Sequence, residues 1–211
     1  REELAAVLAA LPTKWRPFFV FLAQTGLRIS EAVAVTWDDV DLGAKPQVNV
    51  RRQHYRGNIT SLKTKYSVRN VPLSPEMVAY LRQRRTGHYA EGGPVFTNQR
   101  GGPVDAPNLR NRMLRPVVKS LGLDWVGFHA FRHTCASMLI ADGKNPKQVQ
   151  RWMGHAKASF TLDVYGHLMD EGLGETTFAP MLPVAPDNGE TTQGPATAGN
   201  TTEPWDQENA V

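Results

Sequence analysis

The spacing of apolar residues changes between residues 48 and 73, and this change constrains the fold more than any other feature. On either side, apolar residues recur with the three-to-four-residue spacing of amphipathic helices, whereas in this segment they alternate with polar residues. The alternation predicts short strands at residues 48–50, 59–63 and 68–73, with turn residues at 56–58. We therefore expect a small antiparallel sheet inserted between helices, in a fold that is mostly α-helical (α+β).

Residues that commonly start or end helices bound the predicted helical segments. Gly26 suits the C-terminal cap of the apolar segment before it, and Ser74 followed by Pro75 suits a helix start. The helices are expected at residues 2–11, 15–25, 30–35, 75–85, 107–119, 129–141, 146–153 and 159–168. Glycine- and proline-rich loops flank a short apolar pair, Val95 and Phe96.

Charge divides the chain into two parts. The formal net charge is +4, but residues 175–211 contain six acidic residues and no Lys or Arg, so residues 1–174 have a net charge of +10. Such an excess of positive charge suits a polyphosphate partner, because neutralised phosphates release counterions. The last 37 residues are low in complexity and have no apolar period, so we expect a folded domain at 1–174 and a disordered tail at 175–211.

Composition excludes two classes of protein. No apolar run reaches the roughly 18 residues that a membrane-spanning helix needs, so an integral membrane protein is not expected. Cys135 is the single cysteine, which excludes an internal disulfide framework and indicates a reducing compartment. The chain begins at Arg1 without an initiator Met or a signal peptide, and we interpret it as a fragment or trimmed chain.

Two motifs in the first half of the chain contain basic residues. T-G-L-R-I-S-E places Arg28 three residues before Glu31, a spacing that would also suit an ordinary surface ion pair on a helix. K-T-K-Y-S-V-R-N-V-P-L begins at Lys63. A solvated edge strand, whose lysines prevent pairing with another chain, would also explain this motif.

A third motif, F-H-A-F-R-H-T, places His129 and Arg132 on one face of a predicted helix. We expect this face to be exposed to solvent and suited to phosphate. The buried stripe of the same helix is expected to contain Phe131, Cys135, Met138 and Leu139. His129 and His133 are four residues apart, but the glutamate of the zinc motif H-E-x-x-H is absent, so no metal site is predicted.

The fourth motif joins W-M-G-H, which ends at His155, to Y-G-H-L, which begins at Tyr165. In this order, T-G-L-R-x-S-E, K-T-(five residues)-N-V-P-L, H-x-x-R-H-T, G-H and Y-x-H-L resemble the catalytic domain of the tyrosine recombinase (phage integrase) family over residues 11–169. The resemblance implies that family's catalytic-domain fold, with residues 1–174 as the DNA breaking and rejoining domain. It also implies an N-terminal core-binding domain, which we expect to be absent from this fragment.

The resemblance assigns roles to individual residues. The implied catalytic set is Tyr165 as nucleophile, Arg28, Arg132, His129, His155 and Lys63 as general acid, with Glu31 supporting Arg28. Lys65 is the alternative lysine, because it stands two residues after Lys63. Phe131 stands where the family usually has Leu, an apolar exchange that should only repack the helix. The DNA-binding candidates are Lys65, Arg69, Arg51, Arg52 and His133.

These residue types suit the cleavage of a phosphodiester. Arginine offers a planar fork of donors that matches non-bridging phosphate oxygens. A tyrosine hydroxyl has a pKa of about 10 and is ionised roughly once in a thousand molecules at pH 7, so a nearby histidine and a positive field must assist its proton loss. Lys63 can protonate the leaving 5′-oxygen. No metal or other cofactor is expected, because the bond energy is kept in a phosphotyrosine ester.

The resemblance implies a site-specific DNA recombinase or integrase that works through a 3′-phosphotyrosyl intermediate. Its implied partners are double-stranded recombination sites, a homotetramer on DNA and accessory directionality proteins, in the cytoplasm or nucleoid of a bacterial or phage-infected host. We favour integration or excision of a phage or mobile element, because the low-complexity extension suits such a protein. The alternatives are Xer-like resolution of chromosome dimers, a type IB topoisomerase-like activity, and DNA binding without catalysis.

Overall fold

The computed structural model describes residues 2–55, 57–62, 66–85 and 92–156. The α-helices are α1 (Glu2–Ala10), α2 (Arg16–Thr25), α3 (Ile29–Ala32), α4 (Pro75–Arg85), α5 (Ala106–Leu109), α6 (Arg115–Ser120), α7 (Phe128–Ala141) and α8 (Pro146–Met153). A 3₁₀ turn covers Trp37–Asp39, and a π-helical segment, Arg110–Leu114, joins α5 to α6. The strands are β1 (Val40–Asp41), β2 (Gln47–Val50), β3 (Arg52–Tyr55), β4 (Asn58–Ser61) and β5 (Arg69–Pro72).

The strands form two small antiparallel sheets. One has the order β1-β2-β5, with Val48 opposite both Val40 and Val71, and the other is the β3–β4 hairpin. Val48 and Val50 of β2 are buried, which is the alternation seen in the sequence. The predicted class, mostly helical with a small antiparallel sheet, is therefore confirmed, although β1 and β3 were not expected.

The ends of the helices follow local chemistry. Gly26 ends α2 in the left-handed region, with φ of 63°, and its N–H donates to the Leu22 carbonyl. Before α4, the Ser74 hydroxyl accepts a hydrogen bond from the Met77 N–H at 3.1 Å. The helix predicted at 159–168 and the domain boundary predicted after residue 174 lie outside the described residues, so both stay predictions.

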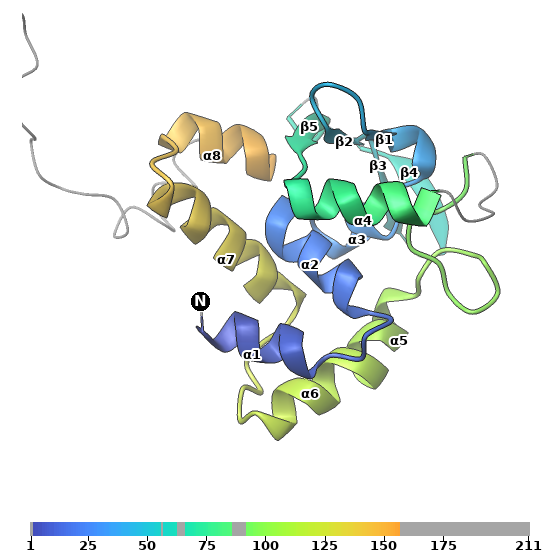
Figure 1. Ribbon diagram of the computed structural model, residues 1–211, viewed down its shortest axis with the longest axis vertical. Coiled ribbons are helices and arrows are strands. Elements are labelled where there is room, and N and C mark those ends of the chain that lie inside the picture. Colours follow the sequence, from blue (N-terminus) through green and yellow to red (C-terminus); the bar gives the residue numbers. More distant parts are fainter. Residues whose placement is uncertain (1, 56, 63–65, 86–91, 157–211) are drawn as a thin grey trace, which may run out of the picture. The chain divides into compact units, whose positions relative to one another are not determined.

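Helix α2 is the centre of the core. In Figure 1 it lies between α7 and α4, and its phenylalanines are all buried. Phe18 packs edge-on against Phe96, with ring centroids 5.1 Å apart, and Phe19 lies 5.3 Å from Phe131 of α7. These contacts fix the relative positions of α2, which ends three residues before Arg28, and α7, which contains His129 and Arg132.

Helix α7 buries a wider face than its apolar pattern suggested. Phe131, Cys135 and Leu139 are buried as predicted, but Met138 is 37% exposed. Arg132 and Ala136 are buried instead, so the buried face is rotated and Met138 falls at its edge. No helix in the part of the chain that the structure describes has the length and apolar character needed to cross a membrane.

Candidate active site

A buried carboxylate joins two arginines that are far apart in the sequence. Glu31 of α3 is 1% exposed and accepts hydrogen bonds from Arg28 Nη1 at 2.9 Å and from Arg69 Nη1 and Nη2 at 3.2 and 2.9 Å. Burial alone would raise the pKa of Glu31, but the hydrogen bond and charge of Arg69, together with Arg28, outweigh it and lower that pKa. Glu31 is therefore an ionised anchor inside the protein and not half of a surface pair.

Arg28 is the partly exposed arginine of this network. Its side chain is 40% exposed, and its backbone N–H donates to Glu31 Oε2 at 2.9 Å, which caps the start of α3. One side of its guanidinium is thus fixed by a buried acid while the side chain still reaches the surface. This arrangement suits an arginine that must be oriented before it meets a phosphate.

Arg69 occupies a different position from the DNA-facing one expected of it. Its side chain is 6% exposed, its Nε donates to the Trp152 carbonyl at 2.7 Å, and its Nη1 also donates to the Ser67 carbonyl at 2.9 Å. Arg69 is buried because Glu31 and two carbonyls supply the partners that water would otherwise supply, and its expected role in DNA binding stays a prediction.

Arg132 is also buried, which corrects the prediction that its helix face is exposed to solvent. It is 7% exposed, and its two Nη atoms donate to the carbonyls of Gly26 and Met153. Those carbonyls lie at the C-terminal ends of α2 and α8, where a helix leaves its last carbonyls without partners and carries partial negative charge. Arg132 therefore connects three helices at one point.

Three of the motif histidines lie within the described residues, and they differ in environment. His155 is 7% exposed, and burial, followed by the charges of Arg132, Arg28, Arg69 and His133, lowers its pKa to about 4. It is therefore neutral at pH 7 and can accept a proton. His129 and His133 are exposed on α7, and burial, His129 and Arg132 lower the pKa of His133. His129 lines a surface hollow that also contains Ile29, the residue after Arg28.

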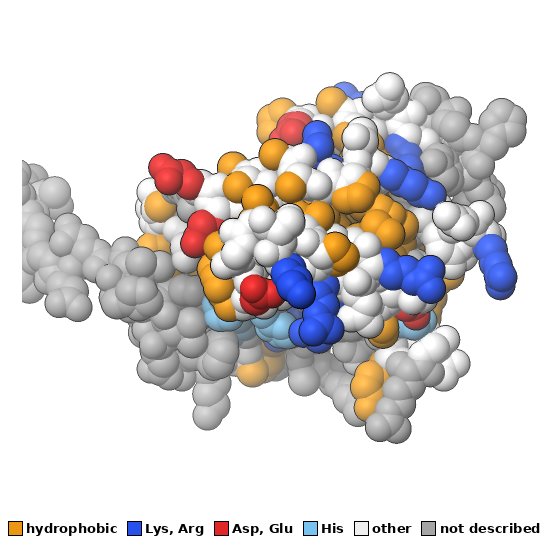
Figure 2. Space-filling view, turned by 90° about the horizontal axis from the view of Figure 1, so that it is seen from below, with side chains coloured by type: hydrophobic (Ala, Val, Ile, Leu, Met, Phe, Trp, Pro, Cys, Tyr) orange, Lys and Arg blue, Asp and Glu red, His pale blue; other side chains and the backbone are white. Residues whose placement is uncertain are grey.

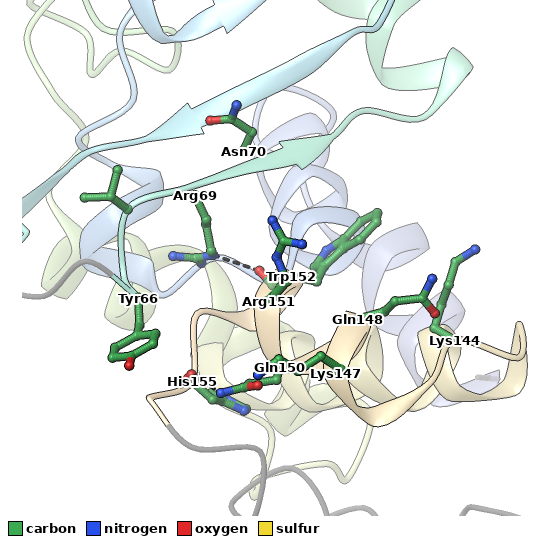
Figure 3. Close-up of a pocket in the computed structure, with 11 residues that line it drawn as sticks. Tyr66, Arg69, Asn70, Lys144, Lys147, Gln148, Gln150, Arg151, Trp152 and His155 are labelled. Carbon is green, nitrogen blue, oxygen red and sulfur yellow. Dashed lines mark hydrogen bonds between the residues drawn. The ribbon is translucent and has the colours of Figure 1, made fainter.

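A groove of about 810 Å³ lies beside this cluster, between the chain leading into β5 and helix α8 (Figure 3). His155 and Arg69 line it at one end, and the exposed side chains of Lys144, Lys147 and Arg151 line it along α8. All the charged side chains among its described lining residues are cationic. Figure 2 shows the face seen from below, where Lys and Arg side chains lie near histidines together with some acidic side chains.

The sequence prediction missed three cations in this region, Lys144 just before α8 and Lys147 and Arg151 on it. A signal was present, because residues 143–156 contain Lys144, Lys147 and Arg151 and no acidic residue. The spacing of four places Lys147 and Arg151 on one face of α8, whereas the motif search followed only Trp152 to His155 in this segment.

Other predicted residues lie apart from this cluster or outside the described residues. Arg51 and Arg52 form ion pairs with the buried Asp39, at 3.3 and 2.7 Å. Lys63, Lys65 and Tyr165 are not among the residues that the structure describes, so their roles stay predictions. Within the described ranges, no three His, Cys, Asp or Glu side chains group in a way that could hold a metal ion.

The fold and the site together define a class of protein. Guanidinium groups from three segments, held by one buried carboxylate and by helix-end carbonyls, surround a neutral histidine beside a cationic groove, as a site for a phosphate group would require. A family model described as the phage integrase family matches residues 2–171, and the chain therefore belongs to the phage integrase, or tyrosine recombinase, family. The resemblance inferred from the motifs is confirmed.

Individual relatives agree with this membership. The transposase from transposon Tn916 of Enterococcus faecalis is 32% identical over 189 residues, which cover 79% of this chain and 46% of the relative. A XerC-like tyrosine recombinase of Caldanaerobacter subterraneus subsp. tengcongensis is 28% identical over 195 residues, which cover 80% of this chain and 49% of the relative. The chain thus spans about half the length of the curated relatives it matches.

Solved structures share the fold. The Tn1549 transposon integrase in complex with circular intermediate DNA has a TM-score of 0.66 and 26% identity, over 76% of this chain and 59% of that chain. The XerA recombinase has a TM-score of 0.63 and 26% identity, over 80% of this chain and 58% of that chain. The predicted tyrosine recombinase catalytic-domain fold is confirmed by these similarities.

Proposed function

We propose that the protein is a site-specific DNA recombinase that cleaves and rejoins strands through a 3′-phosphotyrosyl intermediate. The observation that carries this proposal is the convergence of Arg28 and Arg132, from distant segments, near His155, with Arg28 held by the buried carboxylate of Glu31 and Arg132 held by helix-end carbonyls. A phosphodiester under attack gathers negative charge on its non-bridging oxygens, and oriented guanidinium groups stabilise that charge. His129 completes the proposed clamp from the exposed face of α7.

The chemistry follows from the roles of these groups. The Tyr165 hydroxyl attacks phosphorus, the Tyr165 oxygen–phosphorus bond forms, and the bond to the 5′-oxygen breaks. A histidine of the site accepts the tyrosine proton, and Lys63 gives a proton to the leaving 5′-oxygen. Attack by a 5′-hydroxyl on the ester reverses the step and rejoins a strand. Arg28 and Arg132 hold the phosphate in both directions.

The proposed partner is double-stranded DNA, bound with its backbone along α8. Lys144, Lys147 and Arg151 supply a row of cations beside the cluster, as a polyanion requires. We propose a homotetramer on recombination sites, with accessory directionality proteins, in the cytoplasm and nucleoid of a bacterial or phage-infected host. The Tn916 and Tn1549 proteins are transposon proteins by name, which supports integration or excision of a mobile element.

A second candidate function is Xer-like resolution of chromosome dimers, which the XerC-like relative supports. The two functions differ in their DNA sites. The full-length protein should recombine either the joined ends of a mobile element with a target or two copies of a chromosomal resolution site. Recombination of plasmids that contain each pair of sites distinguishes them.

The test of the chemistry is a nicked duplex substrate from which the cleaved fragment diffuses away, followed by denaturing gel analysis. The wild-type protein should give a DNA adduct that survives denaturation, and Tyr165→Phe should give none while retaining DNA binding. Tyr66→Phe is the matched control, because Tyr66 is an exposed tyrosine that lines the groove. Loss of the adduct in Tyr66→Phe, with the adduct retained in Tyr165→Phe, would show that Tyr66 and not Tyr165 is the nucleophile.

A further inference from the structure

Arg69 contacts both the carboxylate of Glu31 and the last turn of α8. From its place at the start of β5, its guanidinium binds both oxygens of Glu31 and its Nε donates to the Trp152 carbonyl. Glu31 in turn accepts hydrogen bonds from the guanidinium and from the backbone N–H of Arg28, each at 2.9 Å. A movement of Arg69 would therefore be transmitted to the carboxylate that orients Arg28.

The same contact fixes the end of α8. Trp152 and Met153 present successive carbonyls that the helix itself leaves without partners, and Arg69 and Arg132 donate to one carbonyl each. The Trp152 indole also donates to the Thr25 carbonyl at 3.0 Å. His155 follows within three residues of Trp152, and its N–H donates to the Gln150 carbonyl at 3.1 Å. The position of His155 thus depends on how this last turn is held.

Gly154 shows how closely Arg69 lies against that turn. Its φ is 67°, and a Cβ at this position would lie 2.8 Å from Arg69 Nη1 and 3.0 Å from its Cζ. A side chain there would push the guanidinium off Glu31 or off the Trp152 carbonyl. Gly143 offers a comparison, because its φ is 75° but a Cβ there would have no neighbour within 4 Å.

We propose that Arg69 is a positioning residue of the active site, which sets Arg28 through Glu31 and His155 through the last turn of α8, and does not contact DNA. The proposal rests on the proposed function, because it assumes that Arg28 and His155 act on a phosphodiester. An arginine is required because donors must point at a carboxylate and a carbonyl in two directions. A lysine has one ammonium group on a flexible stem and cannot hold both.

The test compares Arg69→Lys and Arg69→Gln with the wild-type protein on the nicked substrate. Three quantities are measured: single-turnover cleavage at saturating DNA, DNA affinity at several salt concentrations, and the unfolding temperature. Cleavage should fall by about 10²-fold or more in both variants, because small misplacements of reacting groups cost rates of this size. DNA affinity and its salt dependence should not change. Methylguanidine should restore part of the cleavage of an Arg69→Ala variant.

Two results would overturn the proposal. A direct DNA contact would lower the slope of log affinity against log salt by about one, because one phosphate contact is lost. A purely structural role would lower the unfolding temperature while leaving cleavage by the folded fraction at the wild-type rate. If the wild-type protein forms no adduct, the proposed function fails, whereas an adduct formed at equal rates by all variants contradicts the role of Arg69 alone.

Gly154→Ala and Gly143→Ala keep the proposal testable if the Arg69 variants do not fold. Both place a side chain at a left-handed position and share that backbone strain. Only Gly154→Ala displaces the Arg69 guanidinium, so it should slow cleavage well beyond Gly143→Ala at equal DNA affinity. Equal cleavage by the two variants would overturn the proposal.

Discussion

At the scale of single residues, the site places a neutral histidine among arginines, and this lowers the stability of the folded protein at acidic pH. His155 has a pKa of about 4, lowered by burial and then by Arg132 of α7, Arg28 before α3, Arg69 of β5 and His133 of α7. The unfolded chain, with an ordinary histidine pKa near 6.5, therefore binds more protons than the folded protein between about pH 6.5 and pH 4. In this window, stability falls as the pH is lowered.

We predict that His155→Asn loses less stability on acidification than the wild-type protein. The difference in the free energy of unfolding between pH 7 and pH 4.5 should be on the order of 2–3 kcal/mol, from urea denaturation without DNA or phosphate. The range stops at pH 4.5 because the ionised Glu31 begins to contribute below its ordinary pKa. Parallel stability curves for the two proteins would contradict the neutral state assigned to His155.

Residue identities could be predicted from the sequence better than residue environments. The Arg28–Glu31 pair and the H-x-x-R motif were visible as patterns, but the burial of Arg69 and Arg132 was not. Apolar periodicity indicates which face of a helix buries carbon, and both arginines are buried by hydrogen bonds to carbonyls that lie 83 and 106 residues away in the sequence. No local spacing contains that information.

At the scale of elements, two strands were missed for physical reasons. β1 has two residues, too few for an alternation to appear. β3 has the sequence R-Q-H-Y, which has no apolar alternation. Its side chains are not buried, and the strand is formed by backbone pairing with β4. Within the described residues, the predicted helices match observed ones, because helix caps and apolar faces depend on local sequence. The π-helical segment between α5 and α6 has no such local signature.

The exposed face of α8 leads to a prediction at this scale. The double variant Lys147→Ala/Arg151→Ala should weaken DNA binding and lower the slope of log affinity against log salt by about two, one for each phosphate contact. Lys14→Ala is the matched control, because Lys14 is exposed on the α1–α2 connection, which lies away from α8 in Figure 1. Filter binding or fluorescence anisotropy from low to moderate salt measures the slope. An equal loss for Lys14→Ala would indicate a general charge effect.

At the scale of the whole molecule, residues 1–174 have a net positive charge and residues 175–211 a net negative one. Deleting residues 175–211 removes six acidic residues and raises the net charge from +4 to +10. We predict stronger non-specific DNA binding, most of all at low salt where screening is weak, with unchanged single-strand cleavage. Affinity for random-sequence duplex and adduct formation are measured on both chains. Loss of assembly on DNA, with cleavage retained, would instead assign residues 177–184 to docking between subunits.

The contacts that Arg132 makes also set an order in time during protein synthesis. Its guanidinium needs the Gly26 carbonyl, made early, and the Met153 carbonyl, made 127 residues later. A ribosome therefore releases α2 well before the last turn of α8, and contacts of such long separation form late in folding. Until then Arg132 has one of its two anchors and His155 does not yet exist. A chain that ends before residue 152 thus contains Arg69 and Arg132 but lacks the Trp152 and Met153 carbonyls that these two arginines bind in the folded protein.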